Sequence, residues 1–386
     1  MSAESVASVY SKDNPFPARI TENRLLTKAG SIKETRHIVL DVRGSGLTHK
    51  PGDSLGAFPT NDPRLVDEVL ERLGARGDET VTLPRGDAVT LREALFSRLS
   101  LALPTRKALE FFGAIATDGG ERAAIERLLA PGAQEQLSAF LREREFVDLL
   151  AEFPSAHPSP QEFVAQLRRM VPRLYSIASS ARAHPGEIHL AVAIVRYTTN
   201  HRQRLGVCST FLAERSELGH GSVPVFVSSS HFGLPERADV DVIMVGPGTG
   251  VAPFRAFLEE RGATGAIGRN WLFFGDQHRA TEFLYEEDFA SMQQKGVLTR
   301  LDTAFSRDQP HKIYAQDRMR EHGAEIWRWL EGGAYFYVCG DAKRMAPDVD
   351  QALQDIVAQH GGKNPAQAAD FVKALRKEKR YQRDVY

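Results

Sequence analysis

The chain is poor in cysteine and has no long apolar run, and each shortage excludes a class of protein. Only two of the 386 residues are cysteines, Cys208 and Cys339. Neither lies in a CxxC pair or beside a histidine, so we expect no disulfide framework and no metal site. No run of about 18 apolar residues could form a membrane span, and the first residues contain no apolar signal core. The net charge of −1 favours neither nucleic-acid nor membrane binding. These absences predict a soluble, cytoplasmic protein.

Two separate segments of the chain alternate in the manner of β strands. Residues 1–17 predict an extended lead-in. Short alternating runs bounded by turn residues predict strands near residues 18–27, 35–44, 53–59, 173–180, 187–197 and 222–230. We therefore predict an antiparallel β-barrel domain built from residues 18–59 and 171–236.

The pattern between these two segments is helical. Asp62 can cap a helix that has Pro63 at its first position, and apolar residues follow it at helical spacing. Apolar residues recur three and four positions apart in four further stretches, 91–99, 104–115, 121–129 and 134–150. We predict a helical insertion over residues 60–170.

Strand and helix patterns alternate from residue 237 to the end. The predicted strands lie near 242–245, 270–274, 297–303, 312–314 and 334–338, and the predicted helices near 252–261, 285–295, 316–330, 342–360 and 366–378. This alternation predicts an α/β doubly wound parallel sheet, whose ligand crevice lies at the carboxyl ends of its strands.

Glycines gather in one loop, Gly246–Gly250, between the first predicted strand and helix of the α/β domain. Such a loop can bring backbone N–H groups and a helix N-terminus to a phosphate, and glycine lets the ligand approach the backbone. It is not the dinucleotide fingerprint G-x-G-x-x-G, because Val251 stands where that motif has its third glycine. An ordinary tight turn between strand and helix is the alternative.

Two polar stretches suit the binding of a pyrophosphate and a flat ring. Arg173 can neutralise a pyrophosphate, and Tyr175, two residues on in the same strand, can stack on a ring. Residues Gly206–Thr210 offer N–H and O–H donors before a short helix. An amphipathic barrel strand and a plain helix cap are the alternatives.

A third polar stretch, residues 304–316, suits a 2′-phosphate. It presents the hydroxyl of Ser306 and the cations of Arg307 and Lys312, where an NAD site would present an acid, and Tyr314 can stack on adenine. A solvated surface loop is the alternative.

Six ordered motifs together carry a resemblance to a known family. They are RLYSIASS, GVCSTFL, VIMVGPGTGVAPFRAF, AFSRDQPHKIYAQ, YFYVCGDAKRMAPDV and RYQRDVY. From about Asn14 to Tyr386 the chain resembles the FAD/NADPH-binding reductase part of the diflavin reductases, which is ferredoxin–NADP reductase-like. Within that family it is most similar to the flavoprotein subunits of NADPH–sulfite reductases.

The resemblance implies roles for individual residues. For FAD it implies contacts with Arg144, Arg173, Tyr175, Ser176, Tyr197, Gly206, Val207, Cys208 and Ser209. For NADPH it implies contacts with Gly248, Thr249, Gly250, Ser306, Arg307, Lys312, Tyr314, Gln316 and Asp341. It groups Ser176, Cys339, Asp384 and Tyr386 at the hydride-transfer centre, with Tyr386 over the flavin face where the nicotinamide must dock.

The resemblance also implies an activity and its partners. We expect NADPH to give a hydride to FAD, and single electrons to pass on to an FMN-containing or flavodoxin-like domain and a sirohaem sulfite reductase subunit. A cytochrome, a nitrate reductase or a flavodoxin is an alternative acceptor, and a non-catalytic NADPH-binding assembly module is the alternative of another class. The basic tail, residues 371–386, is a candidate docking face for an acidic partner, or simply a solvated helix.

Two departures from the family pattern stand out. Gly233 occupies a position where relatives often have an arginine, so a pyrophosphate-directed cation is missing. In addition, no stretch resembles an FMN domain, which leaves either a fragment or a natural single-flavin subunit.

Overall fold

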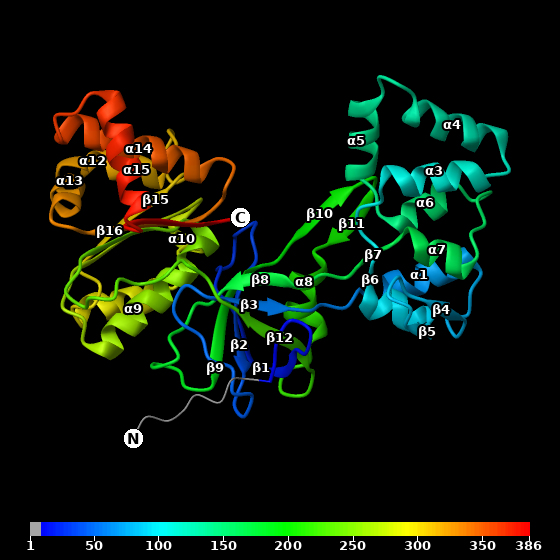
Figure 1. The fold of residues 1–386 in the computed structure, drawn as a ribbon, viewed down its shortest axis with the longest axis horizontal. Coiled ribbons are helices and arrows are strands. Elements are labelled where there is room, and N and C mark those ends of the chain that lie inside the picture. Colours follow the sequence, from blue (N-terminus) through cyan, green and yellow to red (C-terminus); the bar gives the residue numbers. More distant parts are fainter. Residues whose placement is uncertain (1–8) are drawn as a thin grey trace. The chain divides into compact units, whose positions relative to one another are not determined.

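A computed structural model describes residues 9–386, and their contacts divide the chain into two compact units (Figure 1). The first unit comprises the chain up to Ala57, Leu174–Ile194 and Ser216–Tyr386. The second comprises Phe58–Arg173 and Val195–Arg215. The domain boundaries that we expect from the sequence stay a prediction, but residues 195–215, which we assigned to the barrel, make their contacts within the second unit.

A six-stranded antiparallel sheet in the first unit curls into the expected barrel. Its strands follow the order β8 (Arg173–Ser176), β3 (Ser54–Ala57), β12 (Val223–Ser228), β1 (Phe16–Leu25), β2 (Thr35–Asp41) and β9 (Glu187–Ala193). The two ends of this order meet, because Ile177, just after β8, forms a bridge with Leu190 of β9. Closure leaves no open edge between these two strands.

The remainder of the first unit is the expected parallel sheet. Its order is β15 (Arg300–Phe305), β14 (Asn270–Asp276), β13 (Val242–Val245), β16 (Tyr335–Gly340) and β17 (Tyr381–Val385), and every pair is parallel. The order reverses direction between β13 and β16, which is where open α/β sheets bind their ligands.

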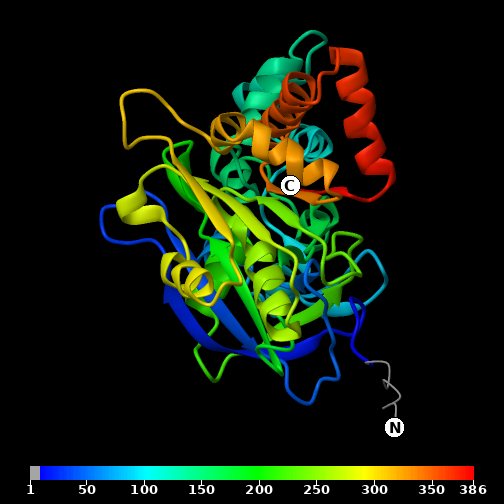
Figure 2. The same cartoon turned by 90° about the vertical axis from the view of Figure 1, so that its left-hand side faces the viewer.

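Helices cover both faces of this sheet (Figure 1). Val242 and Met244 of β13 pack toward α9 (Ala252–Thr264) and α11 (Glu286–Gln294). Their neighbours Ile243 and Val245 pack on the other face against α12 (Ala315–Glu321), α13 (Gly323–Glu331), α14 (Met345–His360) and α15 (Pro365–Lys377). Figure 2 shows α15, in red, on the other side of the strands from α9, in yellow-green.

Most predicted elements of the α/β domain are present, but three expectations were wrong. Residues 312–314 form no strand and lie in the loop before α12. The predicted helix 316–330 is two helices that meet at His322. The fifth strand is β17, which we did not predict. Its burial pattern does not alternate clearly, and its sequence, YQRDV, is mostly polar.

Barrel and α/β domain share a buried polar contact inside the first unit. Arg255 of α9 pairs with Glu259 at 2.8 Å and donates to the carbonyl oxygen of Ala178 at 2.8 Å. Beside it, His37 Nδ1 of β2 lies 2.9 Å from the hydroxyl of Tyr285. Burial, and then the charge of Arg255, lowers the pKa of His37 to about 2, so its imidazole is neutral at ordinary pH.

The second unit is mainly helical, as expected for the insertion. Its helices are α1 (Pro63–Leu73), α2 (Leu91–Glu93) with the π-helical turn Ala94–Arg98, α3 (Arg106–Ile115), α4 (Gly119–Leu129), α5 (Gln134–Arg142), α6 (Phe146–Glu152), α7 (Pro160–Gln166) and α8 (Val207–Thr210) with the π-helical turn Phe211–Arg215. Asp62 caps α1 by accepting from the backbone N–H of Arg64, as predicted. The predicted helix 134–150 breaks between α5 and α6.

Three short strand pairs complete the second unit. They are β4 (Thr80–Thr82) with β5 (Ala88–Thr90), β6 (Leu99–Ser100) with β7 (Arg168–Arg169), and β10 (Arg196–Thr199) with β11 (Arg202–Leu205). The first unit also contains α10 (Arg279–Glu282) and the 3₁₀ turn Gly248–Val251. Within residues 9–386, no helix is both long enough and apolar enough to cross a bilayer.

Candidate functional site

The glycine loop lies at the reversal point of the parallel sheet, and its glycines meet different requirements. A Cβ on Gly250 would lie 2.2 Å from the carbonyl oxygen of Cys339 in β16, a distance that no real Cβ tolerates. A Cβ on Gly248 would make only an ordinary contact, 3.8 Å from Asp276 Oδ2, but its φ is +56°, a conformation that favours glycine. The loop therefore presses directly on the carboxyl end of β16.

Ser176 and Asp384 meet beside this junction. The Ser176 hydroxyl donates to Asp384 Oδ2 at 2.7 Å, which joins the barrel to β17. Cys339 lies opposite Asp384 in the β16–β17 register, with its Sγ 3.8 Å from the same carboxylate oxygen. Three residues that the sequence groups by resemblance are thus in contact.

Cys339 is a neutral thiol in this setting. Its side chain is fully buried, and burial followed by the charge of Asp384 raises its pKa well above the ordinary value. The raised pKa disfavours the thiolate, which is the form of cysteine that acts as a nucleophile. The thiol is left as a small polarisable group at the end of β16.

The terminal residue is held at the same junction. The Tyr386 N–H donates to the carbonyl oxygen of Gly340 at 3.1 Å, and its own carbonyl accepts from Ala342 at 3.1 Å. Its phenol lies 3.2 Å from the hydroxyl of Thr249 in the glycine loop. The residue as a whole remains 63% exposed. Tyr386 is thus an ordered cover over this junction with an accessible ring.

A pocket of about 440 Å³ opens along the carboxyl ends of β14, β15 and β16. Four of the five residues expected at the 2′-phosphate and adenine line it: Ser306, Arg307, Lys312 and Tyr314. Gln316 does not; it faces Asp348 at 3.5 Å. Within residues 9–386, Arg307 and Lys312 form no ion pair, so their charges are available to an anion.

Asp341 lines the same pocket, but as a cap. Its Oδ2 accepts the backbone N–H of Arg344 at 2.6 Å and of Met345 at 3.1 Å, and these bonds lower its pKa. The side chain shapes the start of α14 and has little remaining capacity to bind a cofactor through that oxygen.

Lys33, Asp276 and Arg344 line the pocket too, and we did not predict them as site residues. Lys33 lies more than 270 residues before Arg307 and Lys312 in the sequence, in a loop of the barrel. Asp276 lies two residues after the predicted strand 270–274 and is the last residue of β14, so its place at a carboxyl strand end could have suggested a role.

The expected FAD residues fall in both units. In the first, Tyr175 and Ser176 are half-buried in β8. In the second, Arg173 and Tyr197 are exposed, Tyr197 by 48%, so the cation and the ring are free to meet a ligand. The exposed aromatic suits the stacking role that the family implies.

The loop at Gly206 is built for a close backbone turn. A Cβ there would lie 2.6 Å from both Ser209 Oγ and Val195 Cβ. Ser209 Oγ accepts from the Val195 N–H at 3.1 Å, and Cys208 is buried at the start of α8. The hydroxyl of Ser209 therefore stabilises the loop at the start of α8.

Arg144 is not a free cation. Its Nε lies 2.9 Å from both carboxylate oxygens of Glu152, and its guanidinium stacks over Phe140 at 3.7 Å. The ion pair gives this arginine a structural contact inside the second unit. Its pyrophosphate role stays a prediction, and one that would require Glu152 to release it.

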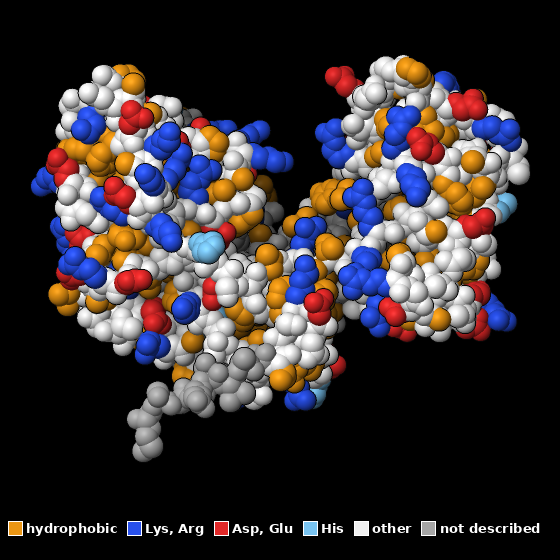
Figure 3. All heavy atoms as spheres, in the orientation of Figure 1, with side chains coloured by type: hydrophobic (Ala, Val, Ile, Leu, Met, Phe, Trp, Pro, Cys, Tyr) orange, Lys and Arg blue, Asp and Glu red, His pale blue; other side chains and the backbone are white. Residues whose placement is uncertain are grey.

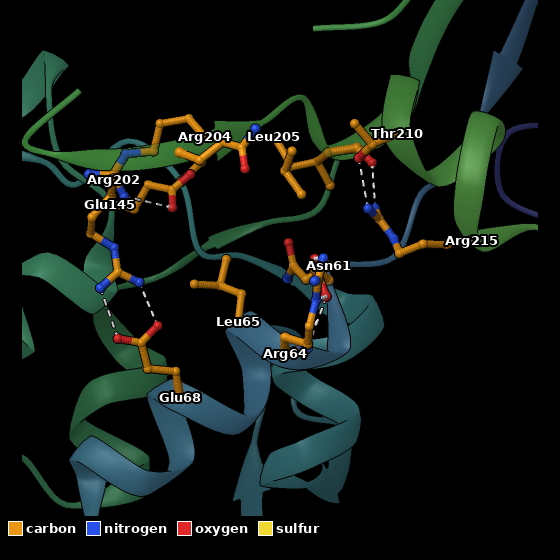
Figure 4. Close-up of a pocket in the computed structure, with 14 residues that line it drawn as sticks. Asn61, Arg64, Leu65, Glu68, Glu145, Arg202, Arg204, Leu205, Thr210 and Arg215 are labelled. Atoms are coloured by element: carbon orange, nitrogen blue, oxygen red, sulfur yellow. Dashed lines mark hydrogen bonds and ion pairs between the residues drawn. The ribbon is translucent and has the colours of Figure 1, made fainter. Parts of the chain in front are cut away.

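A second pocket, of about 300 Å³, lies wholly within the second unit (Figure 4). Its arginines are already partnered: Arg202 pairs with Glu68, and the buried Arg204 lies 3.2 Å from Glu145 and 2.7 Å from Asp148. Burial raises the pKa of Glu145. This pocket is a network that joins the β10–β11 hairpin to the helices of its own unit.

Comparison with known proteins places this arrangement in a family. A family described as "FAD binding domain" matches residues 8–211, more than half of the chain. The chain belongs to this family. A second family, "Oxidoreductase NAD-binding domain", matches residues 244–351. The expected fold class is confirmed, and so are FAD and a nicotinamide dinucleotide as cofactors.

Relatives of the FAD-binding family are similar over nearly the whole chain. The "Sulfite reductase [NADPH] flavoprotein alpha-component" of Bacillus subtilis is 46% identical over 98% of the chain. Its namesakes from Serratia proteamaculans and Photorhabdus laumondii are 44% identical over 98% and 99%. The chain spans 62% of the length of each. The resemblance seen in the sequence is thereby confirmed.

Proposed function

We propose that this chain is an NADPH-dependent flavoprotein reductase of the sulfite reductase type. It accepts a hydride from NADPH on FAD and passes electrons singly to an FMN-containing or flavodoxin-like domain, and from there to a sirohaem sulfite reductase subunit. The observation that carries the proposal is the contact among Ser176, Cys339 and Asp384 at the reversal point of the sheet. The names of the relatives support the choice of acceptor.

The residues at this junction fit a nicotinamide facing a flavin. FAD, when bound, supplies a ring that takes up two electrons together and releases them one at a time. The carboxylate of Asp384 favours positive charge developing on a nicotinamide, and the Ser176 hydroxyl orients that carboxylate. Cys339 adds no positive charge there, and within residues 9–386 Asp384 forms no ion pair. Tyr386 excludes water from the junction until a nicotinamide displaces it.

The 2′-phosphate pocket favours NADPH over NADH. Arg307 and Lys312 are unpaired cations beside the Ser306 hydroxyl, and a 2′-phosphate would gain charge-assisted hydrogen bonds from them. NADH has only a hydroxyl at that place and would leave the two cations without a partner.

A docking face on the basic tail is supported in part. Lys and Arg side chains gather over the α/β domain on the face drawn in Figure 3. Lys377 and Lys379 form no ion pair within residues 9–386, whereas Arg380 donates to the carbonyl oxygens of Leu330 and Ala334. Arg380 therefore caps carbonyl groups at and just beyond the C-terminal end of α13, and the docking proposal rests on the two lysines.

Anaerobic titration of the flavin-loaded protein tests the function. NADPH should bleach the flavin absorbance, and NADH should do so far less effectively. In Arg307→Ala this preference should shrink by about tenfold or more, since a charged hydrogen bond contributes roughly 1.5–3 kcal/mol. A protein that binds NADPH but is never bleached would instead be the non-catalytic assembly module. Turnover measured with a cytochrome, a nitrate reductase, a flavodoxin and a sulfite reductase subunit, each in turn, distinguishes among these electron acceptors.

A further inference from the structure

Lys33 places a cation from the barrel inside the pocket of the α/β domain. It lies in the loop between β1 and β2, and its ammonium pairs with the carboxylate of Asp276 at the carboxyl end of β14. The side chain of Asp276 is 4% exposed and that of Lys33 is 40% exposed. Both residues line the pocket that holds Arg307 and Lys312.

A buried carboxylate is out of place in a pocket for a polyanion. Asp341, the other acid there, already accepts two backbone N–H groups at the start of α14. Asp276 accepts one, from Gln277 at 2.8 Å, and Lys33 is its ionic partner. Its charge would repel a phosphate unless it serves to hold a cation, and the half-exposed ammonium of Lys33 keeps hydrogen-bonding capacity toward the pocket.

We propose that Lys33 binds the diphosphate bridge of the nicotinamide dinucleotide, and that Asp276 is the positioning residue that holds its ammonium in the pocket. The proposal rests on the function proposed above. On this assignment, Lys33 supplies the positive charge that relatives often supply with an arginine at the position of Gly233.

The position of Asp276 indicates that the phosphate group beside Lys33 is the diphosphate bridge. On one side its Oδ2 lies 3.8 Å from where a Cβ of Gly248 would be, in the loop that faces the nicotinamide half. On the other side its carbonyl oxygen accepts the N–H of Ser306 at 2.9 Å, in the 2′-phosphate stretch. A dinucleotide that reaches from the glycine loop to Ser306 must pass Asp276, and its middle is the diphosphate.

Binding measurements on the flavin-loaded protein test this assignment. NADP⁺, NAD⁺ and adenosine 2′-monophosphate, which lacks the bridge, are titrated by calorimetry against the wild type, Lys33→Met and Lys33→Arg. Lys33→Met should weaken NADP⁺ and NAD⁺ by the same factor, about tenfold, as expected for one charged hydrogen bond. It should leave adenosine 2′-monophosphate unchanged, and Lys33→Arg should restore most of the loss.

Lys28→Met is the matched control, because Lys28 lies in the same loop but pairs with Glu286 at 3.3 Å, outside the pocket lining. It should bind all three ligands as the wild type does. Unchanged binding of NADP⁺ by Lys33→Met would overturn the proposal. Equal weakening of adenosine 2′-monophosphate would also overturn it, since Lys33 would then serve the 2′-phosphate.

A double variant separates direct contact from charge neutralisation. If Lys33 only masks Asp276, then Lys33→Met combined with Asp276→Asn should bind NADP⁺ as the wild type does, and that result would overturn the proposal. We expect the double variant to stay weak. Failure of the wild type itself to bind NADP⁺ would instead overturn the proposed function, so the two failures are distinguishable.

Discussion

Replacing Gly250 by alanine tests the contact between the glycine loop and β16. The added methyl would lie 2.2 Å from the carbonyl oxygen of Cys339, 2.8 Å from its carbonyl carbon and 3.1 Å from the Cα of Gly340. All three atoms belong to the backbone of a strand that is paired on both sides, so none can swing away. The loop must move instead. We expect a loss of about 2–3 kcal/mol in the free energy of unfolding, the upper range for overpacking.

Two other glycines provide controls of graded severity. Gly248→Ala meets no atom nearer than 3.8 Å but keeps the φ of +56°, so it should lose about 1–2 kcal/mol. Gly233→Ala has its nearest atom at 4.0 Å and an ordinary φ, so it should be close to neutral. The expected order of destabilisation is therefore Gly250, Gly248, Gly233.

Tryptophan fluorescence during urea unfolding measures this order. The three tryptophans, Trp271, Trp327 and Trp329, all lie in the α/β domain, so their emission reports the part of the molecule that carries the loop. Displacement of the loop from Cys339 should also slow flavin reduction in Gly250→Ala, which stopped-flow absorbance can follow. Equal stability of the three alanine variants would refute the reasoning, and so would Gly250→Ala with wild-type stability and rate.

Three further outcomes are expected. Asp384→Asn keeps the shape but loses the charge beside Cys339, so flavin reduction by NADPH should slow by roughly 10–100-fold with unchanged FAD content; a wild-type stopped-flow rate would contradict the role of this carboxylate. Gly233→Arg has its nearest non-local atom 4.0 Å from the new Cβ and adds a cation, so the KM for NADPH should fall, and an unchanged or higher KM would contradict this expectation. Folding lowers the pKa of His37 from 6.5 to about 2. Between these two pH values the unfolded chain binds a proton at His37 and the folded chain does not, so the free energy of unfolding falls as the pH falls. Between about pH 7 and 5 the wild type should lose about 2 kcal/mol more than His37→Gln in urea unfolding, and parallel pH profiles would contradict the assignment.

The sequence predicts the α/β domain well where hydrophobic pattern decides structure. The buried strand Val242–Val245 has the predicted bounds, because four apolar residues between polar neighbours leave no other choice. The hydrophobic pattern does not predict a strand whose formation depends on a neighbouring strand. The run at 312–314 looks like a strand but finds no neighbour, and Tyr381–Val385 reads as mixed polar but pairs with β16.

The candidate site also contains residues that the sequence predicts and residues that only the tertiary fold brings together. Arg307 and Lys312 belong to one motif, so their closeness in the structure can be predicted from their closeness in the sequence. Lys33 and Asp276 meet only through the tertiary fold, and no spacing rule joins residues that far apart. The structure also adds a reason for glycine at position 250 that the sequence does not show, because β16 approaches it too closely for a Cβ, while the predicted ligand contact of this loop stays a prediction.

The discontinuity of the first unit has a consequence for synthesis on the ribosome. Strand β1 pairs with β12, and Phe16 faces Val225 in that ladder. At roughly 5–20 residues per second, β1 waits on the order of 10–40 s for its neighbour to be made. The segment Phe58–Arg173 is contiguous and emerges during that wait. The order of synthesis therefore favours a helical unit that folds early while unpaired barrel strands are still exposed, which is when this chain would be most prone to aggregate.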